Sequence, residues 1–436
     1  IPVAGMEKIC KILDNRDNKK LRSIDALDIC NIIGSVVVAG NVRRSAEIAL
    51  GDPDDILFLR AKRWDLGNIP NWRAMSNNTI YTDEYNHIMD EVWDGYKGNG
   101  EPYGFFNLPL CQKYGRLKDG KLGKDHPFYN KEDSCIGVNP CGEIPLADKE
   151  CCNLSELYLN NIDSQEELNE CAFLLYKTQK AISSLSFIHE ETNKIVHKNM
   201  RLGLGVTGVC QSLDKLKWLD NCYVSLRKFD KEWSAQNNLP VSIKLTTCKP
   251  SGTLSLLGGS TPGVHPGFSK FYIRRVRMSS NDKLIQYCKD LGYKIEYLIN
   301  YDKSIDHNTV VVEFPCCSGE DALVTSEMTA IRQLNIVKEL QEIWADNAVS
   351  VTVYYRMNEL EGIKEWMKTN YKNSLKSVSF LLHSDHGFLQ APYSEISQEE
   401  YLKVKEGVRE INSTSFEGGG PIIDGLECAG GVCPIR

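Results

Sequence analysis

The stretch S-C-I-G-V-N-P-C-G-E-I-P-L-A-D-K-E-C-C-N, residues 134–153, determines how the rest of the chain is interpreted. It holds four cysteines and places an amide, a thiol and a carboxylate at alternate positions, Asn139, Cys141 and Glu143. A proline and a glycine separate them, so we expect extended or turning backbone here rather than helix. Residues two apart on an extended chain project to the same side. The pattern therefore predicts that the three side chains face one substrate.

The residue types in this stretch suggest thiol chemistry. Cys141 is the candidate reactive sulfur, Glu143 the candidate general base and Asn139 a positioning amide. Cys152 follows in the same stretch and is a candidate half of a reducing dithiol. These residues favour a redox or thiol enzyme, and they leave buried structural cysteines or a metal site as alternatives.

Composition excludes several classes of protein. The net charge of −7 argues against a nucleic-acid-binding role, because phosphate binding favours basic proteins. We find no apolar run long enough to cross a bilayer and no signal peptide, so we expect a cytoplasmic protein without membrane contact. The 16 cysteines show no zinc-site spacing, so we expect no metal centre and mostly reduced thiols.

Two further loops have the character of anion sites. The turn A-G-N-V-R-R-S-A at 39–46 carries two adjacent arginines and suits either an anionic ligand or plain solvation. The stretch C-K-P-S-G-T-L-S-L-L-G-G-S at 248–260 follows a predicted strand, and its proline suits the first turn of a helix. Hydroxyls and backbone N–H groups at a helix start can cradle a phosphate, although an ordinary capped turn is the alternative. The residues concerned are Ser251, Gly252, Thr253 and Ser255.

Strand and helix patterns alternate along the chain, which favours an α/β architecture with a mainly parallel sheet or barrel. Ser164 and Glu167 form a capping box that predicts a long helix after them. The glycine-dense run at 201–208 indicates close backbone packing. We expect other helices at 25–38, 85–96 (capped by Thr82), 325–344 and 360–367, and strands at 241–247, 310–314, 349–355 and 378–382.

The last residues differ from the rest. After the flexible E-G-G-G-P at 417–421, Cys428 and Cys433 enclose Ala-Gly-Gly-Val close to the end. A terminal dithiol in a glycine-rich segment suits a redox shuttle better than a structural link.

Several of these motifs together resemble ribonucleotide reductases. The motifs are G-N-V-R-R-S-A-E at 40–47, N-P-C-G-E-I-P-L at 139–146, C-N-L-S-E-L at 152–157, P-S-G-T-L-S at 250–255 and the terminal C-A-G-G-V-C-P-I-R. They look most like the adenosylcobalamin-dependent (class II) ribonucleoside-triphosphate reductases. The resemblance implies the carboxy-terminal half of a ten-stranded α/β barrel over residues 1–410. It also implies an inserted finger loop at about 134–153 and a flexible redox tail at 411–436.

The resemblance also implies residue roles. Cys141 would carry a thiyl radical that abstracts the 3′-hydrogen of the ribonucleotide. Glu143 would take the 3′-hydroxyl proton, and Asn139 would orient the substrate hydroxyl or Glu143. Cys152 would be one member of the dithiol that reduces the 2′ carbon.

The remaining expectations concern ligands and partners. Cys428 and Cys433 would re-reduce the active-site disulfide and be recycled by a thioredoxin-type protein. The cofactor would be adenosylcobalamin and the substrate a ribonucleoside triphosphate, with its phosphates at the 251–255 loop. A deoxynucleotide effector would influence base choice through the specificity loop, which comprises Gly40, Asn41, Val42, Arg43, Arg44 and Ser45.

One part of the family pattern is missing. The second cysteine of the reducing pair lies far upstream of the finger loop in the family, and neither Cys10 nor Cys30 has the right context. We therefore expect the carboxy-terminal part of a split or trimmed reductase, with the other half-barrel and the effector site on a partner chain. One alternative is a class I large-subunit fragment, with Tyr354–Tyr355 as its radical pair, although strand packing explains that pair better. The other is an inactive remnant that acts as an assembly partner.

Overall fold

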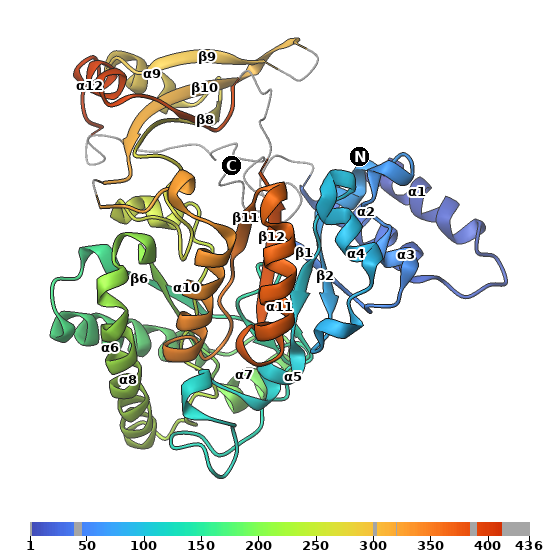
Figure 1. Ribbon diagram of the computed structural model, residues 1–436, viewed down its shortest axis with the longest axis vertical. Coiled ribbons are helices and arrows are strands. Elements are labelled where there is room, and N and C mark those ends of the chain that lie inside the picture. Colours follow the sequence, from blue (N-terminus) through green and yellow to red (C-terminus); the bar gives the residue numbers. More distant parts are fainter. Residues whose placement is uncertain (1, 39–45, 300–302, 320, 384–389, 412–436) are drawn as a thin grey trace.

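The structure is a computed structural model that describes residues 2–38, 46–299, 303–319, 321–383 and 390–411 (Figure 1). Two amino-terminal helices, α1 (Pro2–Asp14) and α2 (Ser23–Val38), pack closely together. A Cβ atom added at Gly5 of α1 would lie only 2.6 Å from a methyl carbon of Val36. Helix α2 confirms the helix predicted at 25–38.

The main sheet contains strands from both sides of the 134–153 stretch. Its order is β1-β2-β3-β12-β11, in which β1, β2 and β3 are parallel, β3 and β12 are antiparallel, and β12 and β11 are parallel. The bounds are β1 Glu47–Gly51, β2 Ser76–Tyr81, β3 Gly104–Phe106, β11 Thr352–Tyr355 and β12 Ser377–Leu382. The expected carboxy-terminal strands are thus joined by three strands that precede the finger loop.

Further hydrogen bonds extend this sheet into an arc. Strands β6 (Leu154–Tyr158) and β7 (Gly203–Thr207) are parallel. The segment 244–248 lies between β7 and the residues that directly precede β11. Parallel bridges join Leu204 to Thr246 and Cys248 to Val349. Within the described residues, the outer edges of β1 and β6 have no strand partner, so the arc is open rather than closed.

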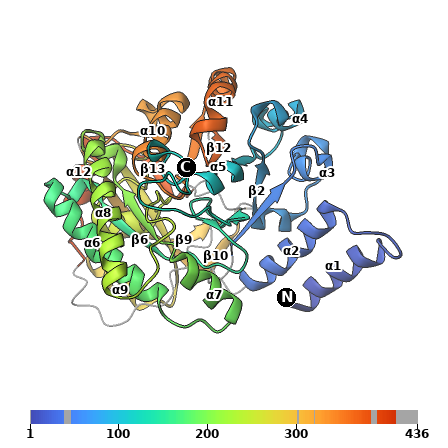
Figure 2. The same ribbon diagram turned by 90° about the horizontal axis from the view of Figure 1, so that it is seen from below.

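Helices follow one another around the outside of the strands, as Figure 2 shows from below. Ser164 accepts a hydrogen bond from the backbone N–H of Glu167 at 3.1 Å, which confirms the predicted cap of α6. The bounds are α3 Ile56–Leu59, α4 Asp90–Asp94, α5 Leu108–Lys113, α6 Gln165–Ser183, α7 Glu190–Asn199, α8 Leu216–Gln236, α10 Ala330–Ile343 and α11 Leu360–Ser374.

The 201–208 run forms β7, and its glycines allow the close packing predicted from the sequence. A Cβ atom at Gly203 would lie 2.6 Å from a side-chain carbon of Leu154 and 2.9 Å from one of Ile144. A larger residue would force the Leu154 and Ile144 side chains to move, since such separations are far below van der Waals contact.

A second, smaller sheet stands apart from the arc at the top of Figure 1 and carries helices α9 (Lys283–Asp290) and α12 (Gln398–Glu406). Its order is β13-β8-β10-β9 and its described pairings are all antiparallel. The bounds are β8 Phe271–Ser279, β9 Lys294–Ile299, β10 Ile305–Cys317 and β13 Tyr393–Glu395. The strand predicted at 310–314 therefore exists, but it belongs to this sheet and not to a parallel one.

Two other local predictions were wrong in detail. The helix predicted at 85–96 is interrupted, because Ile88 and Met89 adopt extended backbone between a 3₁₀ turn and α4, and Thr82 does not cap it. Ile88, Val92, Trp93 and Tyr96 are nevertheless buried, so the apolar spacing identified a buried face and not a continuous helix. Residues 241–247 form one isolated bridge, at Thr246, instead of a regular strand.

Within the described ranges, no helix has the length and apolar character needed to cross a membrane. In the same part of the chain, no group of three or more His, Cys, Asp or Glu side chains is arranged to hold a metal ion.

Candidate active site

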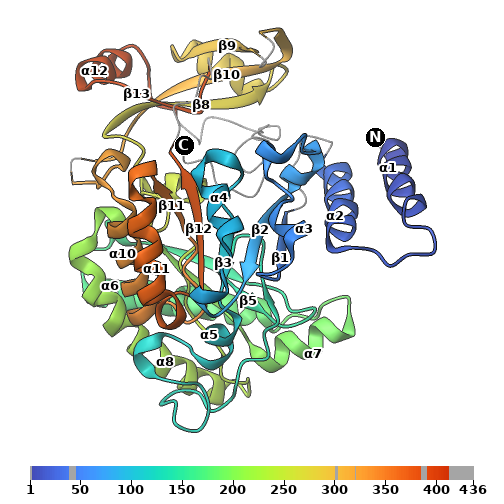
Figure 3. The ribbon, with the colours of Figure 1, turned by 45° about the vertical axis from the view of Figure 1, so that its right-hand side comes forward.

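The 134–153 stretch forms a β-hairpin of β4 (Gly137–Val138) and β5 (Pro145–Leu146), and Figure 3 shows β5 near the lower end of the β1–β3 strands. Its turn is closed by two kinds of hydrogen bond. The backbone N–H of Gly142 donates to the carbonyl of Asn139 at 2.8 Å. The side-chain oxygen of Asn139 accepts from the N–H groups of Glu143 and Ile144 at 3.0 and 2.9 Å. Asn139 therefore shapes the turn itself.

The turn separates the three residues that simple alternation predicted to share one side. Cys141 is exposed at the tip, whereas Asn139 and Glu143 are buried at its base. Gly142 has φ +84°, a left-handed conformation that favours glycine, and it reverses the chain between Cys141 and Glu143. The structure thus brings the predicted residues together in one turn, with the thiol foremost.

Contacts from both halves of the arc hold the tip. The side chain of Asn77 on β2 donates to the carbonyl of Pro140 at 3.0 Å. From the other side, the hydroxyl of Ser350 donates to the carbonyl of Cys141 at 2.5 Å. The backbone N–H of Ala348 and the hydroxyl of Thr247 donate to the carbonyl of Glu143 at 2.8 and 3.1 Å. The hairpin is therefore fixed between the two sets of strands.

Glu143 has the properties of a general base in a dry site. It is 2% exposed, and its Oε2 accepts no hydrogen bond from the described residues. Burial raises the pKa of Glu143, while Asn139 and Lys249 oppose the rise and the carboxylate of Glu156 adds to it. A carboxylate with a raised pKa and a free oxygen can accept a substrate proton.

Cys152 lies just before β6 and close to Glu143. Partial burial of the thiol, and then the Glu143 carboxylate, raise the pKa of Cys152, although the residue as a whole is exposed. The next residue anchors it, since the Asn153 side chain donates to the carbonyl of Gln179 at 2.7 Å and to the Ser183 hydroxyl at 3.0 Å. Cys10 and Cys30 lie on α1 and α2 and are free thiols, so neither pairs with Cys152 here.

The predicted phosphate loop has a short helical turn instead of a full helix. Leu254–Gly258 is a 3₁₀ helix of five residues, so its dipole contributes little. Ser251 has φ +51°, and its hydroxyl donates to Glu156 Oε2 at 2.6 Å. The hydroxyl of Ser255 is buried and has no hydrogen-bond partner among the described residues.

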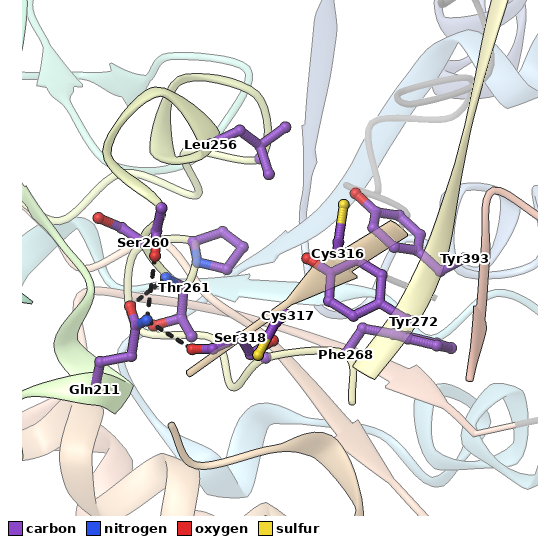
Figure 4. A pocket seen from close by; sticks show the side chains of 14 residues that line it. Gln211, Leu256, Ser260, Thr261, Phe268, Tyr272, Cys316, Cys317, Ser318 and Tyr393 are labelled. Atoms are coloured by element: carbon purple, nitrogen blue, oxygen red, sulfur yellow. Dashed lines mark hydrogen bonds between the residues drawn. The ribbon is translucent and has the colours of Figure 1, made fainter. Parts of the chain in front are cut away.

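A cavity of about 220 Å³ opens beside this loop (Figure 4). Gly252 and Leu256 line one side, and Tyr272, Cys316 and Tyr393 of the second sheet line another. Gln211 joins the two parts, because its side-chain amide donates to the carbonyls of Gly259 at 3.2 Å and Ser318 at 2.8 Å and accepts from the N–H of Thr261 at 2.6 Å. The loop therefore borders open space.

Other predicted site residues lie outside the described residues. These are the specificity-loop residues Gly40, Asn41, Val42, Arg43, Arg44 and Ser45 and the tail cysteines Cys428 and Cys433. Tyr355 is described, and it lies buried in β11, stacked on Tyr96 with its hydroxyl bonded to the Tyr96 carbonyl at 2.6 Å. This packing agrees with the structural interpretation of the tyrosine pair.

Comparison with known proteins shows which family the chain belongs to. Residues 115–220 and 242–381 match the family described as "Ribonucleotide reductase, barrel domain". The chain belongs to the ribonucleotide reductase family. The match includes the finger loop, Cys152 and the phosphate loop, and it confirms the resemblance seen in the sequence.

Two curated reductases are similar to this chain over most of its length. The adenosylcobalamin-dependent ribonucleoside-triphosphate reductase of Lactobacillus acidophilus is 32% identical over 98% of this chain and 61% of its own length. The enzyme of the same name from Euglena gracilis is 34% identical over 93% of this chain and 56% of its own. The chain thus spans about three fifths of the curated relatives that it matches.

Solved reductase structures give the same picture. A B-12 dependent (class II) ribonucleotide reductase superposes with a TM-score of 0.79 at 29% identity, covering 93% of this chain and 59% of that one. The class Id reductase alpha subunit of Actinobacillus ureae superposes with a TM-score of 0.52 at 14% identity, covering 82% and 74%, and shares the fold.

Sequence reasoning missed several residues of this candidate site. Thr247 and Ser350 hold the finger loop, and Lys249 and Glu156 form an ion pair of 3.1 Å behind the phosphate loop. Glu156 lies inside the motif C-N-L-S-E-L and Lys249 directly precedes P-S-G-T-L-S, so both were within reach of motif reading. Nothing in the sequence indicated that they pair.

Proposed function

We propose that this chain supplies the finger loop and much of the barrel of an enzyme that reduces ribonucleoside triphosphates to 2′-deoxyribonucleotides. The observation that supports this most is the turn of the finger loop. It presents an exposed thiol, Cys141, next to a buried carboxylate, Glu143, with a free oxygen. Radical chemistry on a ribose needs a reachable thiol and a desolvated base together.

Each residue then has a defined step. The Cys141 thiyl radical takes the hydrogen from the 3′ carbon and Glu143 accepts the 3′-hydroxyl proton, while the 2′-hydroxyl takes a proton from the Cys152 dithiol and leaves as water. Cys152 and a second thiol supply two electrons and become a disulfide, and Cys141 returns its hydrogen to the 3′ carbon. The balance is one ribonucleotide and one dithiol to one deoxyribonucleotide, one disulfide and water.

The cofactor proposed from the relatives is adenosylcobalamin, which would supply the radical that oxidises the Cys141 thiol. The exposed position of this thiol fits a radical source that is not part of the chain. The Cys428–Cys433 dithiol would reduce the active-site disulfide and be recycled by a thioredoxin-type protein.

The second thiol and the effector site are proposed to lie on an amino-terminal partner chain. Two observations support this part of the proposal. The described arc has unpaired outer edges at β1 and β6, where additional strands can join. The relatives are also longer than this chain.

The decisive experiment combines the chain with an amino-terminal reductase segment, adenosylcobalamin, dithiothreitol and CTP, and measures dCTP. We expect turnover by the mixture and none by the 436-residue chain alone, because the proposed second thiol of the reducing pair lies on the partner. Cys141→Ala should abolish turnover and leave the folded state intact, because the residue is exposed.

Cys30→Ala, which removes an exposed cysteine of α2, is the matched control and should retain activity. Turnover by Cys141→Ala, or loss in both variants alike, would contradict the proposed role.

A further inference from the structure

The phosphate loop lacks a positive charge of its own. Its predicted ligands are hydroxyls and backbone N–H groups of Ser251, Gly252, Thr253 and Ser255, and its five-residue 3₁₀ turn adds little dipole. A nucleoside triphosphate carries several negative charges, and protein sites normally offset such charge with lysine, arginine or a metal ion. A nearby cation would therefore strengthen phosphate binding at this loop.

Lys249 is positioned to be that cation. It stands two residues before Ser251, and its side chain is 15% exposed. Its stem crosses β7 at Gly205, where an added Cβ atom would lie 3.2 and 3.3 Å from two of its methylene carbons. Glycine at this position therefore lets the lysine chain lie along the strand.

The Lys249 ammonium is held by a single acceptor. Its Nζ lies 3.1 Å from Glu156 Oε2, which is the one acceptor it has within the described part of the chain. An ammonium group has three N–H donors, so two remain for a ligand.

Glu156 connects this ammonium to the loop. Its side chain is 1% exposed on β6, and Oε2 accepts from both Lys249 and the Ser251 hydroxyl, the latter at 2.6 Å. Ser251 has φ +51°, a conformation that costs energy for a residue with a side chain, so this hydrogen bond helps to hold it there. The other carboxylate oxygen, Oε1, is buried and has no partner among the described residues.

We propose that Lys249 is a phosphate-binding residue of the ribonucleotide site and that Glu156 is the residue that positions it. The inference rests on the proposed function, because it takes the ligand to be a ribonucleotide. Glu156 balances the lysine charge and aligns Lys249 with Ser251. The two remaining N–H donors of Lys249 bind phosphate oxygens beside the Ser251 hydroxyl, which shares the acceptor Glu156 Oε2 with the lysine.

The test measures equilibrium binding of CTP and of cytidine by calorimetry, with the chain combined with the amino-terminal reductase segment and with no cofactor or reductant present. Losing one charge-assisted hydrogen bond weakens binding by about 10- to 100-fold, so Lys249→Met should raise the Kd for CTP by this factor. The Kd for cytidine should not change, because cytidine has no phosphate. Lys249→Arg should restore most of the CTP affinity, and Lys194→Met, which removes an exposed lysine of α7, should have no effect.

Glu156 variants test the positioning role. Glu156→Gln keeps an acceptor oxygen for Lys249 and Ser251 but removes a negative charge, so we expect CTP affinity at or above that of the unaltered protein. Glu156→Ala removes the anchor and should weaken CTP binding by about 10-fold.

The inference is overturned if Lys249→Met leaves CTP binding unchanged, or if it weakens CTP and cytidine equally, since the latter indicates a structural role. If the unaltered chain combined with its amino-terminal segment binds neither CTP nor cytidine, the proposed function fails and the inference fails with it. The first two results leave the proposed function standing, so the two failures are distinguishable.

Discussion

The finger-loop turn can be perturbed at Gly142, and the structure gives the size of the effect. Its φ of +84° costs a residue with a side chain about 1–2 kcal/mol. An added Cβ atom would also lie 2.9 Å from the hydroxyl of Ser377, well inside the ordinary contact of about 3.5 Å. Ser377 is buried in β12, so either its hydroxyl rotates within a packed site or the turn shifts. Because a displacement of ~1 Å at a reacting group can cost about 100-fold, we expect Gly142→Ala to lower turnover by about 10- to 100-fold.

The assay is dCTP formation by the reconstituted enzyme, with two matched variants. Gly120 has φ +82°, but no atom lies within 4 Å of an added Cβ there, so Gly120→Ala carries the same backbone cost without the contact and should keep its activity. Adding Ser377→Gly to Gly142→Ala should restore part of the turnover, because it removes the contact but not the backbone cost. Full activity in Gly142→Ala, or equal losses in the Gly142 and Gly120 variants, would refute this reasoning.

Other predictions concern the redox tail and the general base. Cys428→Ser combined with Cys433→Ser should block turnover with thioredoxin but spare much of it with dithiothreitol, and equal loss with both reductants would contradict a shuttle. Because Glu143 must be ionised to act and burial raises its pKa, activity should fall with decreasing pH at a value above the ordinary ~4.3. Lys249 lowers and Glu156 raises the pKa of Glu143, so Lys249→Met should move this acid limb of kcat/KM to higher pH and Glu156→Gln should move it to lower pH. Shifts of both variants in the same direction would contradict these opposite effects on Glu143.

The parts of the fold that the sequence predicted are those set by local chemistry. The cap of α6 depends on Ser164 and a backbone N–H three residues away, so nearby residues suffice to specify it. The glycines of β7 likewise predicted close backbone packing, because glycine is otherwise uncommon inside a strand. The finger loop was predicted as extended or turning from its proline and glycine, and it is a hairpin.

The parts that were missed depend on distant partners. Lys249 and Glu156 are 93 residues apart, and no local pattern reports such a pair. The second sheet is antiparallel although its strand signals resemble those of the arc, since strand propensity does not specify the partner. The helix predicted at 85–96 failed for another reason. The apolar spacing correctly predicted which side chains are buried, but the backbone is extended at Ile88 and interrupts the helix.

Because of the way the finger loop is anchored, its reactive side chains can be replaced without removing the hydrogen bonds that hold the loop. The contacts that hold the tip from the arc reach main-chain carbonyls, namely those of Pro140, Cys141 and Glu143. Carbonyl groups are the same whatever side chain follows, so replacing the thiol of Cys141 or the carboxylate of Glu143 removes none of these bonds. Asn139 is the exception, because its side-chain oxygen closes the turn. A variant at Asn139 therefore changes the shape of the site, whereas variants at the other two positions report on chemistry.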